Sequence, residues 1–78
     1  MIISRVVLHD FANALNDLQP ESHITVAKYA IEKLAPRAVA FEEQLAIIRE
    51  NLANVYEERE EWTEAAKVLA GISLESNR

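Results

Sequence analysis

The chain has 78 residues, enough for one small domain and close to the lower limit for a core without disulfides or metal. Half of the residues are hydrophobic, 27% are charged and none is cysteine, which excludes a disulfide scaffold, a thiolate metal site and a disordered chain. The net charge of −5 comes entirely from residues 40–78, which hold nine acidic and four basic residues. That balance argues against binding a nucleic-acid backbone and favours, weakly, a basic protein partner. No apolar run is long enough to span a membrane.

The composition predicts an all-α chain, because it has one glycine, two prolines and many Ala, Leu, Glu and Lys residues. In residues 1–19 apolar residues recur every three or four positions, which predicts a first helix that must end before Pro20. Pro20 suits the start of a second helix, because a proline at the first helical position loses no hydrogen bond. The second apolar stripe ends at Pro36, where we expect a third helix to begin.

The rest of the chain fits one long helix or two packed helices. The apolar stripe of the third helix continues in phase through Trp62, Ala66 and Leu69, and only Arg59 interrupts it. A single rod over residues 36–70 is therefore one interpretation, and such a rod could pair with a second copy as a coiled coil. The alternative is a turn within the sequence YEEREEW.

An internal repeat at an offset of 38 residues favours the turn, since offsets of this size are typical of stacked helix pairs. The first copy turns at Pro20, so the second should turn near Glu58. The offset pairs apolar residues of the two copies as follows: Val7 with Leu45, Ala14 with Leu52, Leu18 with Tyr56, Ile24 with Trp62, Ala27 with Ala65, Ile31 with Leu69, and Leu34 with Ile72.

A tetratricopeptide-like pattern also predicts a turn near Glu58. In such a pattern small residues let two helix backbones approach, and a tyrosine fills the angle between the two helices. We therefore predict a right-handed stack of two antiparallel hairpins, about 1–35 and 36–72, with Gly71 as the last helix cap and 73–78 as an exit linker or tail. If Trp62 is buried in this stack, Trp62→Ala should cost roughly 3–5 kcal/mol. The predicted packing residues of the repeat are Leu52, Ala53, Tyr56, Trp62, Ala65 and Leu69.

Several short segments occur in a characteristic order along the chain. They are ISR at 3–5, PR at 36–37, FEEQ at 41–44, LANVYEEREEW at 52–62 and AAKVLAGI at 65–72. In this order they resemble the subunit-4 family of the COP9 signalosome, a complex similar to the proteasome lid. The resemblance covers nearly the whole chain and includes no catalytic motif.

The resemblance implies a scaffold segment of helical repeats, from which the carboxy-terminal winged-helix PCI domain of the family is absent. It implies other signalosome subunits and cullin–RING ubiquitin ligase components as partners, in the cytoplasm and the nucleus. In that complex a different, zinc-dependent subunit removes the modifier Nedd8 from the ligases, so we expect no enzyme activity and no cofactor here. The alternatives are a generic tetratricopeptide-like adaptor and a helical oligomerisation module, which could form a homodimer through exposed stacking faces.

The residues themselves offer few candidate sites. His9 and Asp10 are adjacent and so diverge on a helix, and His23 has no partner at metal spacing, which argues for ordinary surface or half-buried histidines and no metal. No nucleophile accompanies the glutamates of FEEQ, whose charge suits a helix N-terminus. The acidic run is either a solvated turn or a contact for a basic partner. The candidate protein-binding residues are Arg37, Glu57, Glu58, Glu60 and Glu61.

Overall fold

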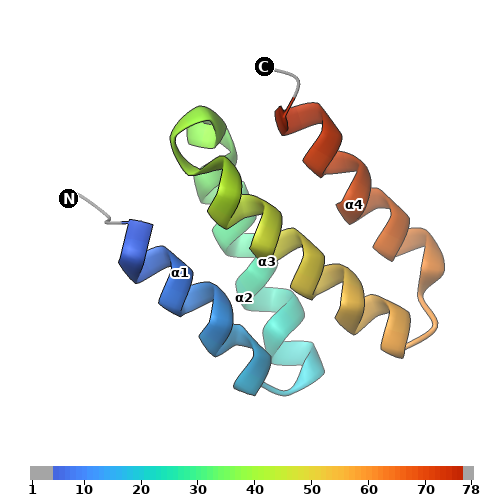
Figure 1. The fold of residues 1–78 in the computed structure, drawn as a ribbon. Coiled ribbons are helices and arrows are strands. Elements are labelled where there is room, and N and C mark those ends of the chain that lie inside the picture. Colours follow the sequence, from blue (N-terminus) through green and yellow to red (C-terminus); the bar gives the residue numbers. More distant parts are fainter. Residues whose placement is uncertain (1–4, 77–78) are drawn as a thin grey trace.

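A computed structural model describes the backbone of residues 5–76 and the side chains of residues 10–71. This part of the chain consists of helices and short turns, without a strand (Figure 1), so the predicted all-α class is confirmed. The elements are α1 (Arg5–Ala14), the 3₁₀ helix η1 (Leu15–Asp17), α2 (Pro20–Leu34), the 3₁₀ helix η2 (Ala35–Arg37), α3 (Ala38–Glu58) and α4 (Trp62–Ser76).

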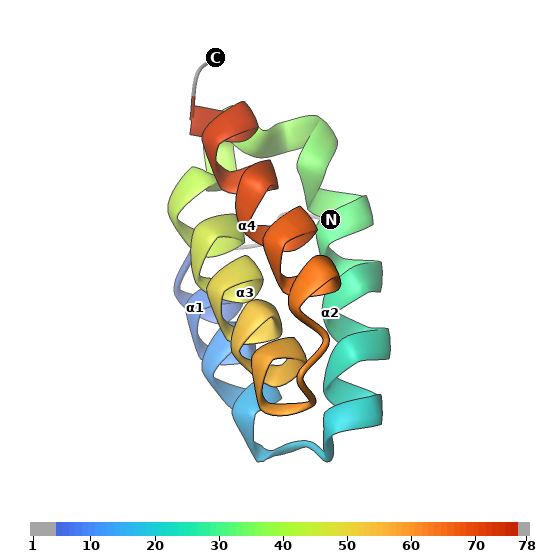
Figure 2. The ribbon, with the colours of Figure 1, turned by 90° about the vertical axis from the view of Figure 1, so that its right-hand side faces the viewer.

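Consecutive α-helices run in opposite directions, so that α2 and α4 rise while α1 and α3 descend in Figures 1 and 2. Helix α3 lies at the centre and packs against each of the other three, most extensively against α4. The result is a flat molecule with extents of 35 × 27 × 15 Å. The order of helices agrees with two successive hairpins, and their tetratricopeptide-like arrangement stays a prediction.

Pro20 fixes the first turn, as the sequence predicts. Gln19 is extended, with φ −64° and ψ 153°, which is the conformation preferred before proline. Pro20 is then the first residue of α2, where its missing N–H costs nothing. Between the two helices the Leu18 amide donates to the Leu15 carbonyl at 3.1 Å. The chain therefore reverses within residues 15–19.

Pro36 marks the second turn, where it lies inside η2. Helix α3 begins at Ala38, two residues after the predicted start. Its first turn is kinked at Phe41, whose φ of −124° and ψ of 29° are not helical. Beyond the kink the helix continues to Glu58 and carries most of the residues that α4 packs against.

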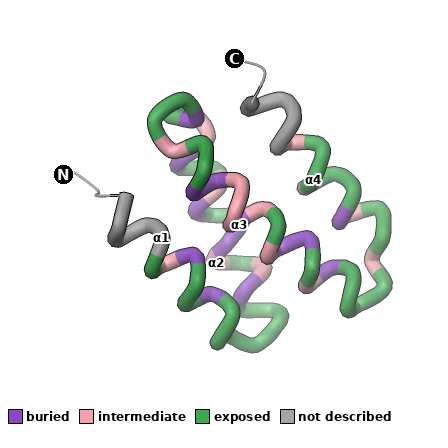
Figure 3. The backbone as a smooth tube through the Cα atoms, viewed as in Figure 1, coloured by how far each residue is buried: buried purple, intermediate pink, exposed green. Residues whose placement is uncertain are grey.

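The core lies along α3, where buried residues from all four α-helices meet (Figure 3). Half of the buried hydrophobic residues are alanines, so the helix axes can approach closely, because interaxial distance follows side-chain size. The core is completed by a few large side chains, for which little space remains to rearrange. The buried hydrophobic residues are Ala12, Leu15, Ala27, Ala30, Leu34, Ala38, Leu45, Ile48, Leu52, Ala53, Tyr56 and Ala65.

The sequence YEEREEW forms a turn between two packed helices. Helix α3 ends at Glu58 and α4 begins at Trp62, so the predicted break is confirmed. Helix α4 folds back against α3 (Figure 2). The single rod over residues 36–70 is therefore wrong, and so is a coiled coil built on it.

The prediction that Trp62 is buried is wrong, because its side chain is 61% exposed. Helix α4 has two apolar faces, and the one that contains Ala65 and Val68 packs against α3. The mean direction of Trp62 and Leu69 lies about 80° around the helix from that of Ala65 and Val68, and Leu69 is 40% exposed. Of the six predicted packing residues, the buried ones are Leu52, Ala53, Tyr56 and Ala65.

Gly71 lies inside α4, so the prediction of a helix cap there is wrong. The helix continues through Ser76, and residues 73–76 are helical rather than an exit linker. The glycine serves a different purpose, because a Cβ at this position would lie 2.5 Å from Nη1 of Arg49. Gly71 thus makes room for an arginine of α3. The Ile72 side chain and residues 77–78 lie outside the described part.

Candidate functional site: an acidic turn beside a groove

Backbone hydrogen bonds around Glu60 hold the α3–α4 turn. The Glu60 amide donates to the Glu57 carbonyl at 2.9 Å, and the Glu61 amide donates to the Tyr56 carbonyl at 2.8 Å. This pair of bonds is a Schellman motif, which caps the last carbonyls of a helix and requires one left-handed residue. Glu60 is that residue, with φ 59°, at a position that glycine usually occupies. The turn is therefore tight, hydrogen-bonded and strained at one glutamate.

The glutamates of the turn fall into two groups. Glu57, Glu58 and Glu60 are exposed and have no ion pair within the described residues. Glu61 is half-buried, and its Oε2 lies 3.1 Å from Nε of Arg59. That oxygen has no hydrogen-bond partner, so the contact is an ion pair without hydrogen-bond geometry. Three carboxylates are thus open to a partner, while Glu61 is engaged within the turn.

Glu57 and Glu58 lie at the unfavourable end of α3. They belong to its last turn, which has no basic residue, and negative charge there is repelled by the partial negative charge of the helix C-terminus. Glu64 differs, because it lies in the first turn of α4, where negative charge is favourable. The helix dipole therefore explains why a negative charge at Glu64 is stabilising. It gives no stabilising reason for the negative charges of Glu57 and Glu58.

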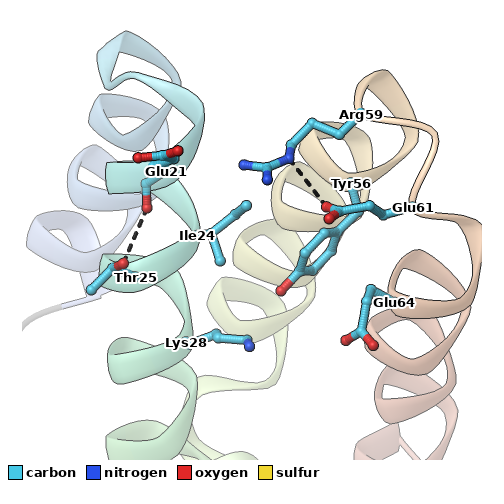
Figure 4. A pocket seen from close by; sticks show the side chains of 8 residues that line it. All are labelled: Glu21, Ile24, Thr25, Lys28, Tyr56, Arg59, Glu61 and Glu64. Atoms are coloured by element: carbon cyan, nitrogen blue, oxygen red, sulfur yellow. Dashed lines mark hydrogen bonds and ion pairs between the residues drawn. The ribbon is translucent and has the colours of Figure 1, made fainter.

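A groove of about 490 Å³ lies beside the turn, between α2 and the α3–α4 hairpin (Figure 4). Tyr56 of α3 forms its inner wall, and Ile24 of α2 faces the tyrosine ring. The side chains of Lys28 and Glu64 flank the Tyr56 hydroxyl from α2 and α4. The full lining is Glu21, Ile24, Thr25, Lys28, Tyr56, Arg59, Glu61 and Glu64.

A second groove of about 300 Å³ continues along α2 and α4, and Lys28, Tyr56 and Glu64 line both grooves. Together the two grooves carry four carboxylates and four cationic groups over an apolar base. Apolar contact area with mixed charge at its rim is typical of protein–protein interfaces. The residues that line only the second groove are Ile31, Glu32, Arg49, Leu52, Lys67 and Val68.

His23 is a core residue, with 1% of its surface exposed, which corrects the expectation of a surface or half-buried histidine. Its Nε2 has no hydrogen-bond partner. Burial lowers the pKa of His23 below its ordinary value of 6.5, and a hydrogen bond with the Leu15 backbone partly opposes that effect. Among the described residues no group of three or more His, Cys, Asp or Glu could hold a metal ion, and the side chain of His9 lies outside them.

Arg37, the other predicted partner contact, lies far from the acidic turn. It is exposed and forms the last residue of η2. The 21 residues of α3 separate it from Arg59, a distance of about 30 Å at the rise of an α-helix. The predicted binding residues therefore form two separate surfaces, and only the glutamates share one.

The α2 side of the groove is missing from the sequence-based prediction. Glu21, Thr25 and Lys28 follow each other at four- and three-residue spacing, so they share one face of α2. The Thr25 hydroxyl donates to the Glu21 carbonyl at 3.1 Å. This spacing is visible in the sequence, but nothing in it indicates that the face lies opposite Tyr56.

A family model described as "PSMD12/CSN4, N-terminal" matches residues 1–78. The chain belongs to this family. COP9 signalosome complex subunit 4 of Arabidopsis thaliana is 43% identical over 76 residues, which cover 97% of this chain and 19% of the relative. The protein of that name from Drosophila melanogaster is 41% identical over 78 residues, which cover 100% of this chain and 19% of the relative.

A third relative, COP9 signalosome complex subunit 4 of Dictyostelium discoideum, is 36% identical over 78 residues, covering 100% of this chain and 20% of the relative. The chain thus spans about a fifth of the length of these relatives. Its match to the PSMD12/CSN4 N-terminal family includes both the acidic turn and the grooves. Within the described residues of this family member, no helix is long and apolar enough to cross a membrane.

Proposed function

We propose that the chain is a non-catalytic scaffold segment of a COP9 signalosome subunit, whose acidic turn contributes to docking of cullin–RING ubiquitin ligases. In this proposal another subunit removes Nedd8 from the docked ligase, and the complex acts in the cytoplasm and the nucleus. The names of the relatives support the signalosome role, and they support other signalosome subunits as partners in this proposal.

The exposed glutamates Glu57, Glu58 and Glu60 are the observation that carries the docking proposal. They project from a turn that is fixed by the Schellman hydrogen bonds and by the contact between Arg59 and Glu61. A rigid turn loses little conformational entropy when a partner binds. Closely spaced carboxylates without an internal ion pair also attract a basic surface before contact, which raises the association rate.

The adjacent groove offers a second contact for the same partner. Tyr56 and Ile24 give it an apolar wall, and the Tyr56 hydroxyl supplies a hydrogen-bonding group between Lys28 and Glu64. Tyrosine is enriched at interfaces because it combines apolar area with one polar tip. A partner held by its basic residues at the turn can therefore place a neighbouring side chain in the groove.

The chemistry of the groove supports binding rather than catalysis. Its lining contains no cysteine or histidine. Its only aliphatic hydroxyl, that of Thr25, donates to the backbone carbonyl of Glu21. Two of its carboxylates are engaged by cations, Glu61 by Arg59 at 3.1 Å and Glu64 by Lys67 at 3.5 Å. The lining therefore contains no serine–histidine or cysteine–histidine pair.

An equilibrium titration of the chain against a purified cullin–RING ligase tests the proposal. The variant Glu57→Lys/Glu58→Lys/Glu60→Lys should bind at least about tenfold more weakly, because each reversal replaces attraction by repulsion. Glu61 is left unchanged, since its loss would also break the contact with Arg59.

The matched control is Glu42→Lys/Glu43→Lys/Glu50→Lys, which reverses three exposed charges elsewhere on α3 and gives the same net charge. The control should bind as tightly as the parent chain. Equal affinity of the parent and the turn variant would remove the acidic turn from the docking mechanism.

A further inference from the structure

The two grooves beside the acidic turn differ in charge. The groove of about 490 Å³ is lined by three carboxylates and two cationic groups, and it reaches Arg59 and Glu61 in the turn. The groove of about 300 Å³ is lined by two carboxylates and three cationic groups, and it lies farther along α3 and α4. Because the two share Lys28, Tyr56 and Glu64, they form one joint groove, with a negative end at the turn and a positive end away from it.

The acidic turn extends the negative end of the joint groove. Glu57, Glu58 and Glu60 are exposed, and within the described residues none of them has an ion pair. Glu21 of α2, on the wall of the groove, is also exposed and also lacks an ion pair there. Carboxylates that are gathered in one place without internal partners attract cationic side chains. This end of the groove therefore suits basic residues of a partner.

The positive end is built by three helices, which contribute Lys28 from α2, Arg49 from α3 and Lys67 from α4. Lys28 has no ion pair within the part of the chain that the structure describes. Lys67 lies 3.5 Å from Glu64, but both side chains are exposed, and exposed pairs are weak. This end therefore suits an acidic residue, which Lys28 and Lys67 can both approach.

The joint groove is apolar between its two charged ends. Leu52 and Tyr56 of α3 are buried and form its floor, while Ile31 of α2 and Val68 of α4 are half-buried and form its sides. An apolar side chain that enters here removes the remaining exposed area of these side chains from water, which is favourable. The groove thus presents a negative, an apolar and a positive region in that order.

The spacing of these regions limits the shape of an occupant. Glu57 and Arg49 are eight residues apart on α3, which corresponds to about 12 Å along the helix. An extended chain covers this distance in about four residues, and every second side chain of an extended chain points the same way. The matching pattern is therefore a basic residue, an apolar residue two positions away and an acidic residue two positions beyond that.

We propose that the acidic turn and the joint groove bind one extended segment of the partner, with basic, apolar and acidic residues in this alternating order. The basic residues lie against Glu57, Glu58 and Glu60, the apolar residue enters the groove, and the acidic residue lies at Lys28. Opposite charges at the two ends position the segment along the groove, because a shift in either direction brings like charges together. This proposal rests on the proposed function, since it specifies the chemistry of the segment that docks at the turn.

Three synthetic peptides with blocked ends test the proposed pattern. The first is Lys-Lys-Ser-Leu-Ser-Glu-Glu, whose charges are segregated as proposed. The second, Lys-Glu-Ser-Leu-Ser-Glu-Lys, has the same composition with mixed charges at each end, and the third, Lys-Lys-Ser-Ser-Ser-Glu-Glu, lacks the apolar residue. Titration of the isotope-labelled chain followed by NMR measures even millimolar affinities. The segregated peptide should bind at least about fivefold more tightly than either of the others.

Lys28→Glu tests the positive end of the groove. This variant should bind the segregated and the mixed peptide about equally, because the glutamate repels the acidic end of the segregated one. Lys33→Glu is the matched control, since Lys33 is exposed on the same helix, lines neither groove and undergoes the same change of charge. It should keep the preference of the parent. Far-UV circular dichroism checks that both variants are helical, and Lys28→Gln, which should also reduce the preference, replaces Lys28→Glu if that variant is not.

Three results would overturn this proposal. They are absence of binding of the segregated peptide up to about 5 mM, equal affinity of the parent for the segregated and mixed peptides, and an undiminished preference in Lys28→Glu. Failure of the proposed function has a different signature, because it appears as parental affinity of Glu57→Lys/Glu58→Lys/Glu60→Lys for the cullin–RING ligase in a titration without peptide. The two failures are therefore distinguishable.

Discussion

Nε of Arg59 and Oε2 of Glu61 lie 3.1 Å apart, and the two residues flank Glu60 in the sequence. Among the described residues other than glycine, Glu60 is the one with a positive φ. The side chains of Arg59 and Glu61 are partly exposed, 37% and 40%, so the pair contributes at most about 1 kcal/mol to stability. Its larger effect is on the pattern of charge. Arg59 pairs with Glu61. The exposed carboxylates of Glu57, Glu58 and Glu60 are therefore the ones in the turn that have no ion pair within the described residues.

Replacing Glu60 by glycine should stabilise the fold by about 0.5–1 kcal/mol. A left-handed conformation costs a residue with a Cβ about 1–2 kcal/mol. Glycine avoids that cost, but it loses more conformational entropy on folding, so the net stabilisation is smaller. Urea denaturation measures the change. The control Glu50→Gly removes the same charge from an exposed position within α3 and should destabilise by about 1 kcal/mol. A loss of stability in Glu60→Gly would show that the strain is absent.

Lowering the pH should destabilise the fold through His23. Burial lowers its folded pKa below the unfolded value of 6.5, so the unfolded chain binds the proton more readily. The stabilising contribution is therefore complete above about pH 6.5 and is lost as the pH falls from there toward the folded pKa.

Urea denaturation between about pH 7.5 and pH 5.5 measures this loss, in a range where histidines titrate. His23→Gln should reduce the dependence of stability on pH in this range. An unchanged slope in His23→Gln would show that His23 is not the group responsible.

Trp62→Ala should cost less than about 1 kcal/mol in dilute solution, because most of the indole is already in water. Tyr56→Ala should cost about 3 kcal/mol, since Tyr56 is 4% exposed and its removal leaves a cavity beside α4. The two variants, unfolded by urea under the same conditions, give the comparison. A greater loss of unfolding free energy in Trp62→Ala than in Tyr56→Ala would contradict an orientation of α4 in which Trp62 faces solvent.

Gly71→Ala should change stability by less than about 0.5 kcal/mol, because two effects oppose each other. Alanine favours a helix over glycine by about 1 kcal/mol, but its Cβ displaces the guanidinium of Arg49. In an Arg49→Ala background that obstacle is gone, and the same substitution should stabilise by about 1 kcal/mol. Thermal or urea unfolding of the four chains checks the cycle, and an equal effect in both backgrounds would exclude the contact.

Local rules made the first two turns predictable. Pro20 and Pro36 restrict the backbone wherever they occur, so their effect needs no knowledge of the tertiary structure. The third turn has neither a proline nor a glycine, and its left-handed residue is a glutamate. The 38-residue repeat and the tetratricopeptide-like pattern were what indicated a break near Glu58.

The remaining errors concern contacts that form only in the folded chain. Helix α4 has two apolar faces at helical spacing, and the sequence does not show that Ala65 rather than Trp62 faces α3. Gly71 has the chemistry of a helix cap, but its function here is to accommodate Arg49 from another helix. The burial of His23 likewise depends on how η1 and α3 pack against α2.

The rate at which the chain associates with a cullin–RING ligase, measured as a function of salt, tests the central claim most directly. The parent should associate more slowly as salt rises from about 0.05 to 0.3 M, because screening weakens the attraction between the acidic turn and a basic surface. Glu57→Lys/Glu58→Lys/Glu60→Lys should associate more slowly at low salt and lose most of this dependence, while Glu42→Lys/Glu43→Lys/Glu50→Lys should keep it. Identical rates and salt dependence for the parent and the turn variant would contradict the claim that the acidic turn is the docking site.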